Sequence, residues 1–443
     1  MNKRYSILSI VAVVAVASFL FGSTYSNTQV VSGNAQSVSP ATIDKVTPQT
    51  IDSVTAKDVQ SVGGLVFNMV GADAIPLDQV AVEKANGRTV HEITLTAQSV
   101  KLPIPGGQMY DAMTFDGQVP GPTIRVTQGD VVEVTLNVPS TELTGHSLDM
   151  HAAQISAVPN FGPVMPGKSN TYAYIANYPG AFKYHCEGVG VIGMDQHVLS
   201  GMYGMIIVDP LNGYHKLLIT RTATQNGQVV LNQTLIDPAA YEFTLQFSQL
   251  YLNADGSYNQ AAMFLHNTTW TVINGKPFGY DPVVTKVWNN APAANDKSAP
   301  LILPVGQHIR YFVVNQGNMP VFFHIVGGQM DRVTQGNMVQ AMGTQTWNIG
   351  GSQDAIVDVV YDQPGAYVIV NHDYAAIFTG AAAVQLAQAS PAPNPSDAVP
   401  PVSSVPDTSI AQQTFVHCEC SSDRAAQLNM TGMSGSMTGM SGQ

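Results

Sequence analysis

Short runs of β-branched and aromatic residues, separated by glycine and proline, constrain the fold of this chain most strongly. The first series lies between residues 91 and 210 and includes VVEVTLNV, TYAYIA and GMIIVDP. A second series, between about residues 214 and 386, includes FTLQFSQLYL, AIVDVVY and GAYVIVNH. Such short strands between turn signals are typical of β-sandwiches. We therefore predict an all-β protein with two sandwiches in tandem.

The two series also resemble each other in sequence. PGAFKYHC occupies residues 179–186, and PGAYVIVNH occupies residues 364–372. A repeat of this kind indicates a duplicated domain, in which one copy can keep the fold and lose part of a site. We expect the first sandwich at residues 81–212 and the second at residues 213–388.

The segments outside the sandwiches differ in composition. Residues 1–23 place two basic residues before a short apolar run, which predicts an export signal that is either cleaved or kept as a membrane anchor. We therefore expect a periplasmic or otherwise extracytoplasmic location. Residues 24–80 are rich in small polar residues and predict a spacer or arm. Residues 389–413 form a Pro/Ser/Ala linker, and residues 414–443 form a flexible tail.

The tail contains soft metal donors. Cys418 and Cys420 precede four methionines in a glycine- and serine-rich stretch. Thiols and thioethers favour Cu(I), so a copper-collecting tail is one interpretation. A low-complexity tail without metal is the other.

Charge and cysteine content exclude two classes of protein. The net charge is -12 with only 18 Lys and Arg residues, which argues against a nucleic-acid partner. Three cysteines are too few for a disulfide scaffold. Cys186 is the only cysteine within the predicted sandwiches.

Metal-ligand side chains recur in the first predicted sandwich, in HSLDMH, YHC and HVLSGM. Consecutive residues of a strand point to opposite faces, so His185 and Cys186 should serve two different metal ions. One thiolate, two imidazoles and one thioether favour an electron-transfer copper. The side chains that supply this set are His146, Cys186, His197 and Met202.

His151 and His185 then remain as ligands of a second metal ion. A catalytic site needs a third ligand and an open position. His372, in VNHD of the second sandwich, is the best candidate for the third ligand. It could come from the same subunit or from a neighbour.

Five motifs follow one another along the chain: HSLDMH, YHC, HVLSGM, FHIVGG and VNHD. With these motifs in this order, residues 90–388 resemble the copper-containing nitrite reductases. The resemblance implies two Greek-key sandwiches of the cupredoxin type and a homotrimer. It implies one type 1 copper per subunit, bound by His146, Cys186, His197 and Met202. It also implies one type 2 copper, bound by His151, His185 and His372 of the adjacent subunit.

The resemblance further implies reduction of nitrite to nitric oxide. Asp149 and His324 would be the catalytic pair, and Val326 would shape the substrate pocket. The reaction takes one electron and two protons, so it needs an electron entry, an open metal position and proton-handling groups. Electrons would enter at the type 1 copper and cross through Cys186 and His185. A small blue copper protein or a cytochrome would be the donor.

Two departures from the family bear on this interpretation. The family often has Glu where Gln345 stands, beside the stretch that positions His324. GVGVIGMDQ lengthens the loop between Cys186 and His197, and it contains Met194 as an alternative thioether. This loop should form part of the electron-donor face.

Three other functions compete. A multicopper oxidase that reduces oxygen needs repeated HxH motifs, and the chain contains none. An electron-transfer protein without catalysis would leave the second histidine set unexplained. The same two coppers could instead oxidise hydroxylamine or another small nitrogen compound, because residue identities do not fix the direction of electron flow.

Overall fold

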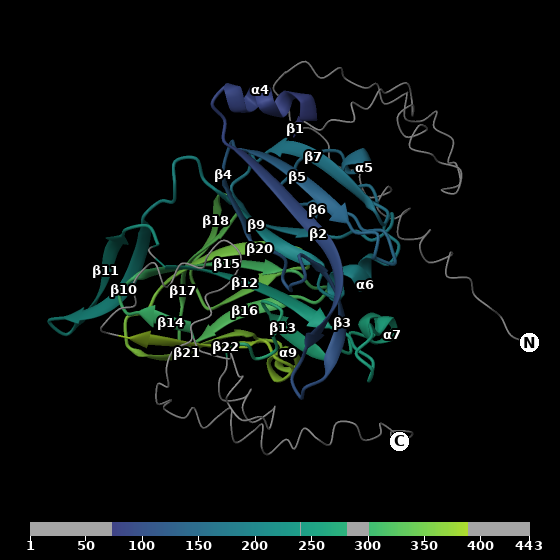
Figure 1. Cartoon of the computed structure of the whole chain (residues 1–443). Helices are drawn as coiled ribbons and strands as arrows, with labels where there is room; N and C mark the ends of the chain where they lie inside the picture. Colours follow the sequence, from purple (N-terminus) through teal and green to yellow (C-terminus); the bar gives the residue numbers. More distant parts are fainter. Residues whose placement is uncertain (1–72, 240, 281–300, 389–443) are drawn as a thin grey trace, which may run out of the picture. The chain divides into compact units, whose positions relative to one another are not determined.

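Two β-sandwiches follow one another in the computed structural model, which describes residues 73–239, 241–280 and 301–388 (Figure 1). The predicted export signal, the linker, the tail and most of the predicted spacer lie outside these residues. None of the described helices is long and apolar enough to span a membrane. The prediction of an all-β fold with two tandem sandwiches is confirmed.

The first sandwich has a five-stranded and a four-stranded sheet, and side chains from both fill one core. The larger sheet has the order β1 (Ala74–Ile75), β7 (Lys168–Ile175), β5 (Val131–Val138), β2 (Val90–Pro103) and β3 (Met109–Phe115). The smaller sheet has the order β4 (Ile124–Thr127), β9 (Tyr203–Asp209), β8 (Gly180–His185) and β6 (Asp149–Met150). Buried residues alternate with more exposed ones along β5, as expected of a strand with one face on a core.

The second sandwich has a six-stranded and a five-stranded sheet around a larger core. The first of these has the order β13 (Trp270–Ile273), β12 (Tyr241–Leu250), β15 (His308–Asn315), β20 (Asp354–Val360), β17 (Met330–Gln335) and β18 (Met338–Thr344). The other has the order β14 (Leu301–Pro304), β22 (Ala382–Gln388), β21 (Gly365–Asn371), β16 (Val321–Val326) and β19 (Thr346–Ile349).

Strand pairing repeats between the two sandwiches. In the first sandwich, β2 pairs in parallel with β5, and β5 pairs antiparallel with β7. In the second sandwich, β12 pairs in parallel with β15, and β15 pairs antiparallel with β20. β4 pairs in parallel with β9, which pairs antiparallel with β8; β14, β22 and β21 do the same. The equivalent strands β8 and β21 carry the sequence repeat PGAFKYHC and PGAYVIVNH, so the topology agrees with a duplicated domain.

Residues 74–80 belong to the first sandwich rather than to the spacer. β1 pairs antiparallel with β7, and Ile75 and Val80 are buried against Val131 and Ala173. The boundary predicted at residue 81 is therefore too late, because a strand of two residues is too short to show an alternating pattern. β1 is followed by η3 (Leu77–Gln79) and α4 (Val80–Ala85).

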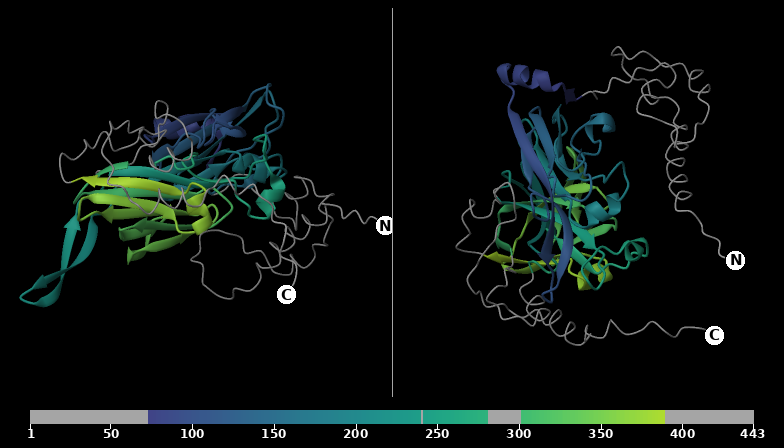
Figure 2. Two further views of the ribbon diagram at one scale, coloured as in Figure 1. Left: turned by 90° about the horizontal axis from the view of Figure 1, so that it is seen from below. Right: turned by 45° about the vertical axis from the view of Figure 1, so that its right-hand side comes forward.

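A hairpin of β10 (Leu217–Gln225) and β11 (Gln228–Ile236) lies between the two sandwiches in sequence and extends away from their sheets (Figures 1 and 2). Its turn residues Asn226 and Gly227 have φ values of 52° and 76°, which suit a tight hairpin turn. Arg221, in the middle of β10, forms ion pairs with Asp331 and Asp362. The remaining helices among the described residues are α5 (Ala157–Asn160), α6 (Met194–Leu199), α7 (Gln260–Phe264) and α9 (Tyr374–Phe378).

Strand β8 contacts the second sandwich through its outer face. Ala181 packs in an apolar cluster with Phe312 of β15. The buried ammonium group of Lys183 donates a hydrogen bond to the backbone oxygen of Gln316 at 3.0 Å. These contacts fix the strand that ends at His185.

Candidate metal centre

The alternation of side chains along β8 separates two sets of ligands. Tyr184 and Cys186 lie in the core of the first sandwich, whereas Lys183 contacts the second sandwich from the opposite face. His185 shares the face of Lys183 because the two are separated by one residue. Within the described ranges, metal-ligand atoms accordingly gather in two groups: His146, Cys186 and His197, and Asp149, His151 and His185.

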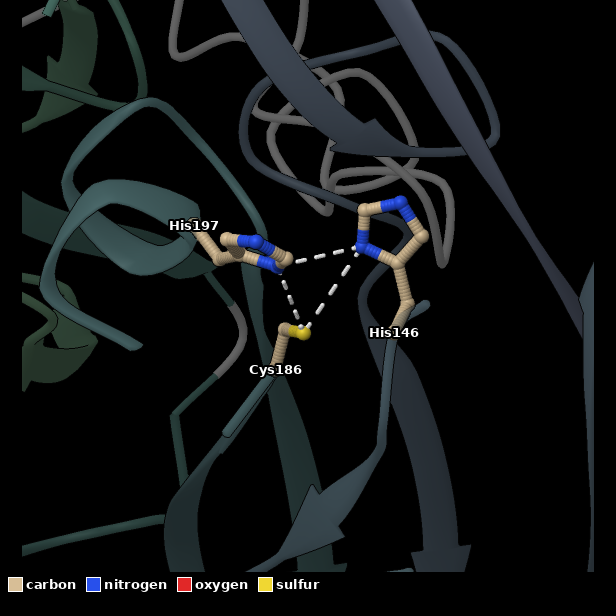
Figure 3. A group of neighbouring side chains, drawn as sticks. All are labelled: His146, Cys186 and His197. Carbon is tan, nitrogen blue, oxygen red and sulfur yellow. Dashed lines mark hydrogen bonds between the residues drawn. The ribbon is translucent and has the colours of Figure 1, made fainter. Parts of the chain in front are cut away.

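In the first group three donor atoms face one another (Figure 3). Nδ1 of His146 lies 3.2 Å from Nδ1 of His197. Sγ of Cys186 lies 3.3 Å from Nδ1 of His197 and 3.9 Å from Nδ1 of His146. Burial lowers the pKa of both imidazoles, that of His197 to about 4, so both are neutral at neutral pH and their lone pairs are available to a metal.

The sulfur of Cys186 also accepts two backbone hydrogen bonds, from the N–H of Ser147 at 3.3 Å and of Gly188 at 3.2 Å. Burial raises the pKa of the thiol more than these amides lower it, so the thiolate needs a cation for full stabilisation. One thiolate and two inward-facing imidazoles fit a copper ion. Ser147 and Gly188 could not be predicted from the sequence, because backbone donors leave no side-chain pattern.

Met202 is the expected thioether ligand of this group. Its side chain is fully buried in the core cluster that contains Cys186. Its backbone N–H donates to the oxygen of His197 at 3.0 Å, and its oxygen accepts from the N–H of Cys186 at 3.1 Å. Met194 instead opens helix α6 and is 36% exposed. These positions favour Met202 over Met194.

In the second group two imidazoles point at each other. Nε2 of His151 lies 3.0 Å from Nε2 of His185, a distance at which the two nitrogens require a shared proton or a cation. Nδ1 of His185 lies 3.0 Å from the backbone oxygen of Cys186. This contact keeps a proton on Nδ1 and leaves the lone pair of Nε2 for a metal.

Asp149 lies beside both imidazoles. Its Oδ2 is 3.4 Å from Nε2 of His151 and 3.5 Å from Nε2 of His185. Burial raises the pKa of the Asp149 carboxyl, but the hydrogen bonds and charges of the two histidines outweigh it and hold the pKa well below its usual range. The group thus combines two imidazole donors with an ionised carboxylate, and copper accepts such imidazole donors.

His324 and His372 lie together in the second sandwich, with ring centroids 5.0 Å apart. His324 and Val326 share one face of β16, and the N–H of His372 donates to the backbone oxygen of Phe322 on the same strand at 2.8 Å. Neither histidine belongs to the two ligand groups found among the described residues. The residues predicted for the second metal therefore form two separate sets within one chain.

The main chain of Gln345 orients His324. Its carbonyl oxygen lies 2.8 Å from Nδ1 of His324, and Oγ1 of Thr346 lies 3.3 Å from the same nitrogen. The contact uses the backbone oxygen of residue 345, which is present with either a Gln or a Glu side chain. The Gln found here in place of the family's Glu therefore keeps the contact. His324 and Gln345 line a cavity of about 620 Å³ together with Arg221 and Tyr367.

The first sandwich matches the family model described as Multicopper oxidase over residues 96–213. The Cu-containing nitrite reductase of Thermus scotoductus SA-01 shares the fold, with a TM-score of 0.55 and 22% identity over 74% of this chain and 67% of that one. Fold and ligand groups define a two-domain copper protein of the multicopper oxidase type.

Two other relatives are more similar in sequence. The copper-containing nitrite reductase of Rhizobium sullae is 33% identical over 319 residues, which are 70% of this chain and 78% of that protein. The copper nitrite reductase of Nitrosomonas europaea has a TM-score of 0.57 at 33% identity, covering 69% of this chain and 96% of that one. The chain belongs to the copper-containing nitrite reductases and is an oxidoreductase of that family.

Proposed function

We propose that this protein reduces nitrite to nitric oxide, with electrons entering at the ligand group of Cys186 and nitrite binding at the ligand group of His185. The observation that carries the proposal is that these two consecutive residues belong to different ligand groups. Their covalent connection gives an electron a short route from one group to the other. Family membership supports nitrite as the substrate.

Copper bound by the two groups supplies one-electron redox chemistry and an open position for the substrate. We assign one type 1 copper per chain to the first group together with Met202. We assign one type 2 copper to His151, His185 and His372 of a neighbouring subunit in a homotrimer. The separation of His372 from the two other histidines within one chain supports this sharing.

The reaction consumes one electron and two protons for each nitrite, breaks one N–O bond, and yields nitric oxide and water. We assign one proton transfer to Asp149, whose carboxylate lies within 3.5 Å of both imidazoles of its group. His324 delivers the other proton. Its Nδ1 is bound to the oxygen of Gln345, which leaves Nε2 to hold the proton that is transferred.

Val326 shapes the substrate pocket in this proposal. It lies on the same face of β16 as His324 and is 47% exposed. An aliphatic side chain there excludes water and leaves room for a small anion.

The electron donor is a small blue copper protein or a cytochrome that docks on the loop between Cys186 and His197. Val191 and Ile192 of this loop are 60% and 76% exposed. Exposed apolar side chains that lie next to each other are typical of contact surfaces. We place this electron transfer outside the cytoplasm, on the basis of the apolar N-terminal segment.

Isotopically labelled nitrite tests the proposal. The copper-loaded protein, given ¹⁵N-nitrite and a reduced small-molecule donor, is expected to release ¹⁵N-labelled nitric oxide. The His185→Ala variant should lose this activity, whereas His215→Ala, outside both ligand groups, should keep it. Absence of labelled nitric oxide from a fully copper-loaded sample would contradict the proposal.

A further inference from the structure

A buried carboxylate lies behind the first ligand group. Oε2 of Glu142 is 3.5 Å from Nε2 of His146, and the two side chains are only 7% and 1% exposed. Nε2 is buried and has no hydrogen-bond partner within the usual limits among the described residues, so the Glu142 carboxylate at 3.5 Å is the group that faces it. The other nitrogen of the ring, Nδ1, faces Cys186 and His197. The two sides of this imidazole thus face a carboxylate and a ligand group.

Glu142 is held in this position by Ser99 of strand β2. The backbone N–H of Ser99 donates to Oε1 at 3.0 Å, and its hydroxyl donates to Oε2 at 2.6 Å. The next residue, Leu143, is fully exposed, so the chain lies at the surface here while the Glu142 side chain points inward. The carboxylate is therefore a fixed buried charge rather than a mobile surface group.

We propose that Glu142 is a positioning residue that fixes the Nε2 proton of His146 and lowers the reduction potential of the type 1 copper. The proposal rests on the ligand assignment made above. A neutral imidazole carries one proton, and a carboxylate that accepts it at Nε2 leaves the lone pair of Nδ1 directed at the metal. No spacing rule marked Glu142, because it lies in an irregular segment four residues before His146.

The sign of the effect follows from charge. A carboxylate behind a ligating imidazole makes that ligand more basic, which favours the more positive Cu(II) over Cu(I). Burial weakens the screening of this interaction by water, so the charge acts more strongly than it would at an exposed site. Removing the negative charge should therefore make the type 1 copper easier to reduce.

Redox titration of the visible type 1 absorption in the copper-loaded full-length protein tests the proposal without using turnover. Glu142→Gln keeps the size of the side chain and removes its charge. At a fixed ambient potential the ratio of reduced to oxidised type 1 copper should rise about tenfold, which is ~59 mV for one electron. Glu142→Asp, which keeps the charge, should stay closer to the wild type.

Asp195→Asn is the matched control. This carboxylate lies two residues before His197, but it accepts hydrogen bonds from Tyr258 and Gln260 instead of facing an imidazole. The variant loses the same formal charge from the same copper region. We expect a smaller change in the redox ratio than in Glu142→Gln, because Asp195 acts on the ligand His197 only through its charge.

Ser99→Ala provides a second test if Glu142→Gln folds poorly. It keeps the carboxylate and removes one of its anchors, so the ratio should shift in the same direction by a smaller factor. An unchanged potential in Glu142→Gln, even with a lower melting temperature, would show a merely structural role and overturn the proposal. A wild-type protein without type 1 absorption would overturn the ligand assignment and this proposal together.

Discussion

His185 and Cys186 are consecutive in the chain, yet their side chains belong to two different groups of metal-ligand atoms. Cys186 follows strand β8 into the core of the first sandwich, and His185 lies on the strand face that contacts the second sandwich. The two-residue period of a β-strand is enough to produce this division. One peptide therefore links the proposed entry point of the electron to the proposed site of nitrite.

Replacing Cys186 should remove the type 1 copper and leave the type 2 copper in place. Cys186→Ala removes the only sulfur anion of the first group, so we expect the visible absorption to disappear and the copper content to fall from two to one per chain. The copper that remains should give the spin resonance signal of an imidazole site. Nitric oxide release should fall to background. Persistence of the colour would contradict the assignment of Cys186.

Removing the charge of Asp149 should slow turnover and leave the colour unchanged. Asp149→Asn keeps the size of the side chain but removes a group that can transfer a proton, so we expect kcat to fall about 100-fold. Visible spectra and copper content, measured on the same sample, control for loss of metal. Full activity of the variant would exclude the proposed role.

Mixed oligomers test the sharing of His372 between subunits. His151→Ala and His372→Ala chains should each be inactive alone. When the two are refolded or expressed together, random trimers should contain about one quarter of the wild-type number of complete sites. Nitric oxide release should recover to a similar fraction. If His372 served its own chain, no mixture would contain a complete site, and activity would stay at background.

The second sandwich should lose stability in acid through Asp358. Burial raises the pKa of this carboxyl, but the hydrogen bond from His308 and the charges of Arg310 and Arg332 outweigh it and lower the pKa to about 2. Since the pKa is near 3.9 in an unfolded chain, the ionised carboxyl stabilises the fold by about 2 to 3 kcal/mol well above pH 4. This contribution is lost as the pH falls through about 2.

Calorimetric melting of the copper-free protein between pH 6 and pH 2.5 measures this effect. Asp358→Asn should be less stable at pH 6 and should show a weaker dependence on pH below 4. Asp362→Asn, at a carboxylate that is 51% exposed, is the control for loss of a surface charge and should change the stability at pH 6 less than Asp358→Asn does. Equal pH dependence of Asp358→Asn and the wild type would contradict the assignment.

The fold and the two ligand groups could be predicted from sequence because both follow from local rules. Strand runs with turn residues indicated the sandwiches, and the alternation of side chains at His185 and Cys186 separated the two groups. Strand β1 could not be predicted, since a strand of two residues is too short to show periodicity. Glu142 could not be predicted either, because its burial depends on Ser99 from a distant strand.

The placement of His372 relative to the other histidines also could not be predicted from the sequence. Its motif marked it as a ligand, but sequence alone left open whether it came from the same chain. The structure pairs it with His324 on the second sandwich, outside both ligand groups of the described residues. Long-range placement of this kind depends on sheet topology, which no local pattern contains.

The most direct test of the central claim combines metal content with product. Copper per chain, visible absorption and electron spin resonance should be measured on one purified sample, followed by nitrite-dependent nitric oxide release from a reduced donor. We predict two coppers per chain, one strongly coloured and one not, together with nitric oxide. One coloured copper without nitric oxide would contradict the account and indicate an electron-transfer protein whose second site does not bind metal.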